Sequence, residues 1–137
     1  MKFVAKILGM LLLTLGVAHA QGASVSVDLN KLESREGACR AYLVFENATD
    51  VAFQSLKLDL VLFDTDGVVA KRLAVEAAPL AAGKTSLSVF DMAGVGCGQA
   101  GRLLLNGVTA CADASGELEG CLDMLAPSAR GEVSFIK

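Results

Sequence analysis

The sequence contains one histidine, His19, and no tryptophan. His19 lies within the first twenty residues, which we expect to be removed during export. The remaining chain would have no imidazole, which excludes Ser-His-Asp and Cys-His mechanisms, imidazole general bases and histidine-containing zinc or copper sites. We therefore predict that the protein is not an enzyme, and we predict no catalytic residue, cofactor or bound metal.

Basic charge and aromatic side chains are also scarce. Without the first twenty residues, 10 basic and 15 acidic side chains remain, giving a net charge of −5, and aromatic residues are 5% of the chain. Nucleic-acid binding needs a cationic surface, and single strands also need aromatic rings for stacking. Nucleic acid is therefore not an expected partner.

No apolar run reaches the roughly 20 residues that a membrane-spanning helix needs. The first twenty residues, MKFVAKILGMLLLTLGVAHA, have Lys2 and Lys6, a short apolar run and then Ala18-His19-Ala20. This pattern predicts a secretory signal peptide (1–20) that is cleaved after Ala20; a retained N-terminal anchor is the alternative. We expect a periplasmic protein with no membrane span after cleavage, in which residues 21–137 form a single domain.

The four cysteines include no pair close enough for a C-x-x-C motif, so neither a redox pair nor a thiolate metal site is expected. They are Cys39, Cys97, Cys111 and Cys121. An even number of cysteines in an exported chain indicates two disulfides, and three connectivities are possible. We prefer Cys111 with Cys121, across a short polar loop, and Cys39 with Cys97.

A long helical period is absent, and apolar residues mostly alternate with polar ones. The clearest case is SLKLDLVLF (55–63), where four leucines fall on one face of a predicted strand. We expect further strands at residues 24–30, 39–47, 68–76, 85–91, 102–110 and 131–136, and a brief helix at residues 118–125. About seven short strands separated by turns predict an all-β, immunoglobulin-like antiparallel sandwich.

The stretch VLFDTDGVV (61–69) resembles the first motif of haloacid dehalogenase phosphatases. In that family, Asp64 would be the phosphoryl nucleophile and Asp66 the general acid/base, beside a magnesium ion. The chemistry needs a parallel sheet with helical crossovers, whereas the residues after Gly67 favour a returning antiparallel strand. We predict a hairpin turn, with the phosphatase as the alternative function.

Five carboxylates lie in or near the predicted turns. Hard cations bind clusters of oxygen ligands, so a calcium-stabilised structural module is a third possibility. The sequence shows no ordered ligand spacing, and solvated turn residues explain the same positions. The carboxylates are Glu46, Asp50, Asp59, Asp64 and Asp66.

The segment NATDVAFQSLKLDLVLFDTDGVV, with the later LAAGKTSLSVFD, resembles FxLYD-type immunoglobulin-like domains of exported bacterial proteins. The shared features are an asparagine-bearing turn, a strand that ends in an aromatic residue and aspartate, and a D-x-D-G hairpin. From GACRAYLVFEN to VSFIK, the chain is also similar to a family of small exported (periplasmic) alphaproteobacterial proteins labelled by a twin-arginine signal sequence, although it has no twin arginine. These resemblances imply a fold and export, but no activity.

Four apolar side chains fall on the outward-facing side of their predicted strands: Tyr42, Val44, Val61 and Phe63. We expect them to form one partly apolar outer face of the sandwich. Such faces, and the free edges of sheets, bind other polypeptides. The sequence therefore predicts a non-catalytic binding module whose partner is another protein or a cell-envelope component.

Overall fold

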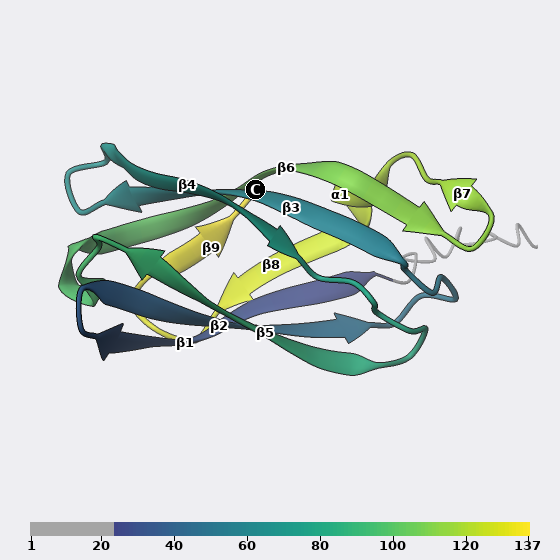
Figure 1. Cartoon of the computed structure of the whole chain (residues 1–137), viewed down its shortest axis with the longest axis horizontal. Helices are drawn as coiled ribbons and strands as arrows, with labels where there is room; N and C mark the ends of the chain where they lie inside the picture. Colours follow the sequence, from purple (N-terminus) through teal and green to yellow (C-terminus); the bar gives the residue numbers. More distant parts are fainter. Residues whose placement is uncertain (1–23) are drawn as a thin grey trace, which may run out of the picture.

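The computed structural model describes residues 24–137, which form two β-sheets packed face to face (Figure 1). The predicted signal peptide and its cleavage site at Ala20 lie outside the described residues. The elements, in chain order, are β1 (Val25–Arg35), β2 (Ala38–Asn47), β3 (Ser55–Asp64), β4 (Val69–Glu76), β5 (Thr85–Ala93), the 3-10 helix η1 (Cys97–Gln99), β6 (Ala100–Asp113), β7 (Gly116–Glu117), α1 (Cys121–Met124), β8 (Leu125–Ala129) and β9 (Ser134–Ile136). The predicted all-β sandwich is confirmed.

The first sheet has the order β5-β2-β1-β8. β2 is antiparallel to β1, to which a short turn joins it, and also to β5, which follows β3 and β4 in the chain. β8 is parallel to β1, with Val25 opposite Leu125. The sequence did not predict β8, because LAPSA is short and contains Pro127, which a sheet accepts only at an edge such as this one.

The second sheet has the order β4-β3-β6-β7, and β9 pairs in parallel with the start of β6. β3 is central, between β4 and β6, whereas β4 lies at the edge of the sheet. The predicted helix at 118–125 is confined to Cys121–Met124. It begins after Gly120, whose φ of 72° is left-handed, and it ends where Leu125 enters β8.

The alternation of apolar and polar residues along the strands determines which side chains form the core. The even-numbered leucines of β3, from Leu56 to Leu62, face inward and are at most 1% exposed. They pack in one cluster with Leu43 and Phe45 of β2 and with Leu105 of β6. Burying each such side chain contributes about 1.5–3 kcal/mol, so this cluster is the main stabilising contact between the sheets.

Both preferred disulfides are confirmed. Cys39–Cys97 joins β2 to η1, and Cys111–Cys121 joins β6 to the start of α1. The cysteines are 58 and 10 positions apart in the chain. On the chain-entropy model these loops contribute about 4 and about 3 kcal/mol to stability.

Asn47 at the end of β2 is 2% exposed and joins two loops. Its Nδ2 donates to the carbonyl oxygens of Val51 at 2.8 Å and Ala81 at 3.1 Å. Its Oδ1 accepts hydrogen bonds from the backbone N–H of Thr49 at 3.0 Å and from its hydroxyl at 2.6 Å. The polar triplet 47–49 therefore forms an ordered connection between β2 and the strands that follow.

Candidate binding surfaces

The D-x-D-G stretch forms the predicted hairpin turn. Oδ1 of Asp64 accepts hydrogen bonds from the backbone N–H groups of Asp66 and Val68, both at 2.9 Å. Gly67 has a φ of 80°, a left-handed conformation that glycine adopts without strain. β3 and β4 pair directly in antiparallel register, so the parallel crossover of the dehalogenase motif does not occur here.

The five carboxylates of the proposed calcium site lie apart. Asp50 precedes β3 and Asp64 ends it, and a ten-residue strand at roughly 3.3 Å per residue separates its ends by about 30 Å. Asp59 lies midway along β3. Across residues 24–137, no group of three or more His, Cys, Asp or Glu side chains is placed to hold a metal ion.

Asp59 is instead the centre of a polar cluster on the outer face of the second sheet. Arg72 of β4 donates two hydrogen bonds to its carboxylate, both at 2.9 Å, and Asn106 of β6 donates one at 2.7 Å. The hydrogen bonds from Arg72, and then that from Asn106, lower the pKa of Asp59 to about 2. The cluster connects the three strands around the middle of β3.

The four predicted partner-binding residues do not form one face. Tyr42 and Val44 lie on β2 in the first sheet, whereas Val61 and Phe63 lie on β3 in the second. Each pair alternates with core residues and so faces away from the core, which places the pairs on opposite outer sides of the sandwich. The expectation of a single face was wrong. Alternation along a strand shows which of its residues point to the same side, but it does not show which strands belong to the same sheet.

The pair on β3 is largely covered. Val61 is only 8% exposed, and it lies opposite Arg72 on one side and Leu104 on the other. The guanidinium carbon of Arg102 lies 4.8 Å from the centre of the Phe63 ring. A charged side chain therefore already covers this aromatic ring, in the geometry of a cation–π contact.

The pair on β2 continues into an exposed apolar surface on β5. Tyr42 lies opposite Val89 and Val44 lies opposite Leu87. Leu87 is 56% exposed and Val89 is 45% exposed. We call these four residues the β2–β5 face.

The alternation in the sequence did not single out Leu87 and Val89. In TSLSVFDMA (85–93), apolar residues occupy both parities: Leu87 and Val89 are odd-numbered, whereas Phe90 and Met92 are even-numbered. Met92 faces the core and is 1% exposed, which turns the odd-numbered residues outward. The one available signal was that apolar residues occupy both odd and even positions, as in a strand with two apolar sides.

Charged residues fix one end of the β2–β5 face. Arg40 donates two hydrogen bonds to the carboxylate of Asp91, at 2.7 and 3.0 Å, and these bonds lower the pKa of Asp91. The hydroxyl of Tyr42 donates to Glu33 at 3.1 Å, and Nζ of Lys31 lies 5.3 Å from the centre of its ring. Tyr42 is therefore held in place beside the apolar residues.

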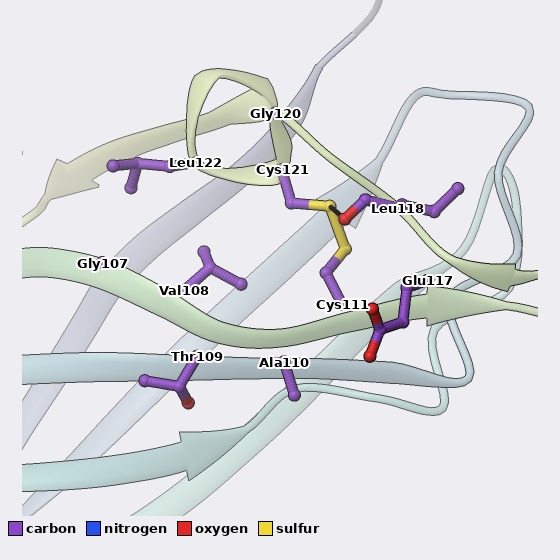
Figure 2. Close-up of a pocket in the computed structure, with 10 residues that line it drawn as sticks. All are labelled: Gly107, Val108, Thr109, Ala110, Cys111, Glu117, Leu118, Gly120, Cys121 and Leu122. Carbon is purple, nitrogen blue, oxygen red and sulfur yellow. Dashed lines mark hydrogen bonds between the residues drawn. A yellow bond between two sulfur atoms is a disulfide. The ribbon is translucent and has the colours of Figure 1, made fainter.

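A second surface lies at the outer edge of β6 (Figure 2). A cavity of about 470 Å³ is lined by residues 107–111, 117–118 and 120–122, and we call it the β6 groove. Figure 2 shows Val108, Leu118 and the Cys111–Cys121 disulfide on one side of the β6 ribbon, with Thr109 and Ala110 on the other. The disulfide fixes the distance between β6 and α1 and so determines the width of the groove.

Together, the two sheets and two disulfides define a disulfide-stabilised β-sandwich. Disulfides of this kind are typical of proteins that fold outside the reducing cytoplasm. Within residues 24–137, none of the helices has the length and hydrophobicity required to cross a membrane.

The fold is similar to that of a solved structure, described as the structural characterization of IrmA from Escherichia coli. The similarity has a TM-score of 0.58 at 14% sequence identity and covers 77% of this chain and 92% of that one. At this identity the likeness concerns the fold alone, and it agrees with the β-rich architecture. No protein-family model matches the sequence, and no curated protein matches it. Neither family resemblance noted in the sequence is therefore confirmed.

Proposed function

We propose that this protein is an exported, periplasmic, immunoglobulin-like binding module that acts without catalysis, by holding another protein or a cell-envelope component. The two disulfides and the signal-peptide pattern support export. The two hydrogen bonds that the Asp64 carboxylate accepts within the turn support a structural role for the first aspartate of the apparent phosphatase motif.

One observation carries the proposal: the β2–β5 face is apolar, exposed and next to a free sheet edge. β5 is the outermost strand of its sheet and, among the described strands, pairs only with β2. Its other edge leaves backbone groups available to an added strand, while Leu87 and Val89 offer apolar contacts beside it. Sheet edges of this kind are normally covered or protected by charge, which makes an uncovered one a binding surface.

A pull-down from periplasmic extract tests the proposal. The bait is the protein without its signal peptide, compared with the double variant Leu87→Ser/Val89→Ser. The matched control is Val68→Ser/Val69→Ser, which removes two valines that are 61% and 58% exposed at the β3–β4 hairpin. Circular dichroism confirms that each variant is folded.

We expect the wild type and the control to capture the same partner and the β5 variant to lose it. A partner captured equally by all three would show that the β2–β5 face is not the binding surface. A monomer that captures no partner at all would contradict the binding function itself.

A further inference from the structure

We propose that the β6 groove binds an extended, basic polypeptide segment, which adds as a strand to the free edge of β6. This site is separate from the β2–β5 face, because it belongs to the other sheet. The proposal therefore goes beyond the function above and can succeed or fail independently of it.

The first argument is a gap in the edge of the second sheet. β6 (Ala100–Asp113) pairs with β3 along most of its length. On its other edge, β9 covers Arg102 to Leu104, and β7 covers Ala112 and Asp113. Between these two short strands, residues 105–110 have no strand partner on that side in the described chain, so the backbone groups that point outward there can bond to an incoming strand.

Two irregularities in the register of β6 with β3 lie within this gap. Lys57 and Leu58 of β3 lie opposite Ala110 and Val108, so Thr109 is an extra residue in β6. A second extra residue, Asn106, lies between the partners of Asp59 and Leu60. Bulges bend and twist a strand locally, which is a physical reason for β7 and β9 to pair only with the two ends of β6.

The groove offers apolar contacts to alternate side chains of an added strand. Val108, Leu118 and Leu122 line it, together with the Cys111–Cys121 disulfide. All three apolar side chains are only half-buried, although they pack against the core cluster. An extended segment places every second side chain on one face, so it can fill the groove with apolar residues while its other side chains stay in water.

Charge determines which segment fits. The stretch 111–124, part of which forms one wall of the groove, contains four carboxylates and no lysine or arginine: Asp113, Glu117, Glu119 and Asp123. Glu117 lines the groove directly, and Figure 2 shows its carboxylate beside Cys111. None of the four forms an ion pair with another of the described residues. One cation, Lys137, lies near α1, where its Nζ donates to the carbonyl oxygens of Leu122 and Leu125.

The occupant is therefore a segment with alternating apolar and basic residues. A basic segment would be drawn to this wall, whereas an acidic one would be repelled by it. The backbone hydrogen bonds of strand addition would supply affinity, and the alternate side chains would supply selectivity.

A synthetic probe tests the inference on the protein without its signal peptide. The probe is a fluorescein-labelled decapeptide of alternating valine and lysine, followed by fluorescence anisotropy. One control peptide replaces every lysine with glutamate. A second control keeps the valine–lysine sequence but is N-methylated on alternate backbone amides, which removes the donors along one edge.

We expect the valine–lysine peptide to bind and both control peptides to bind at least tenfold more weakly. In NMR spectra, the largest shifts should occur at the amides of residues 105–110, and their hydrogen exchange should slow by at least tenfold in the complex. Leu87→Ser/Val89→Ser should leave binding of this peptide unchanged, which separates the present site from the β2–β5 face.

A matched pair of charge variants tests the acidic wall. Glu117→Lys/Glu119→Lys should weaken binding about tenfold or more, whereas Glu36→Lys/Glu132→Lys changes the net charge equally at exposed positions outside the groove lining and should change it less than twofold. The inference is overturned if the peptide does not bind, if both charge variants weaken it equally, if N-methylation has no effect, or if the shifts fall on β5.

Discussion

Gly101 of β6 lies directly against the carbonyl oxygen of Asp64, at the point where β3 enters its hairpin. A Cβ built on Gly101 would overlap that oxygen and would crowd the Cα atom of Thr65, which would lie 3.1 Å away. The colliding atoms belong to backbone that is held by hydrogen bonds from Asp66 and Val68 to Asp64. The turn therefore cannot move away from a side chain at position 101 without breaking these hydrogen bonds.

Gly101→Ala should accordingly destabilise the fold by about 1–3 kcal/mol, as overpacking against a fixed neighbour does. Urea denaturation followed by circular dichroism measures the change. Gly98→Ala is the matched control, since a Cβ there meets no atom within 4 Å. Equal stability of the two variants would contradict the close approach.

Asn47→Ala should lower the free energy of unfolding by about 2–3 kcal/mol, because it leaves buried hydrogen-bonding groups in two loops without partners. The carbonyl oxygen of Val51 and the N–H of Thr49 both lose a bond. Thermal denaturation checks the effect. Asn30→Ala, at an exposed position on β1, should change stability by less than about 0.5 kcal/mol.

Asp59 should make stability depend on pH in the acid range. Its pKa falls from the usual 3.8 to about 2 in the folded protein, so folding favours the ionised form. The resulting stabilisation is fully present above about pH 4 and is lost as the pH falls through about 2.

Asp59→Asn should remove this contribution, so urea midpoints for wild type and variant should differ at pH 6 and converge near pH 2. The control is Asp66→Asn, at the exposed hairpin tip. If the urea midpoints of wild type and Asp59→Asn differed by the same amount from pH 6 to pH 2, folding would not favour the ionised form of Asp59.

Cys111→Ser/Cys121→Ser should lower the free energy of unfolding by about 3 kcal/mol and should release the wall of the β6 groove. Hydrogen exchange should accelerate in residues 114–124, while amides of β3 stay protected. Cys39→Ser/Cys97→Ser is the comparison, with an expected loss of about 4 kcal/mol and no local effect on residues 114–124. An unchanged exchange pattern in the first variant would show that the wall is held by packing alone.

The sequence predicted the elements with strong alternation and clear turn residues. β2, β3 and the β3–β4 hairpin lie close to their expected positions, because inward leucines and the Asp-Gly turn are local signals. Both disulfides also paired as preferred. These features depend on residues near one another in the chain or on a small number of possible pairings.

The sequence did not predict which strands share a sheet, and the candidate surfaces depend on that. Tyr42 and Val61 each alternate with core residues along their own strand, but β2 and β3 belong to different sheets. Leu87 and Val89 became part of a surface only because β5 pairs with β2 in a register that aligns them with Val44 and Tyr42. The β6 groove depends on two bulges and on β7, none of which has a local signal. It also depends on the parallel pairing of β9 with β6, whereas the sequence predicted only a strand over residues 131–136.

Because β1 pairs in parallel with β8, the first sheet can finish folding only after the C-terminal part of the chain is present. Val25 and Leu125 are neighbours in the sheet but stand a hundred positions apart in the chain. A chain emerging from the ribosome or an export channel thus presents β1 with one unprotected edge until nearly all the rest has followed. Pairings this distant form slowly and expose the growing chain to association with its own copies. Chains truncated before residue 125 should therefore aggregate through β1, whereas chains that include β8 cover that edge of β1 themselves.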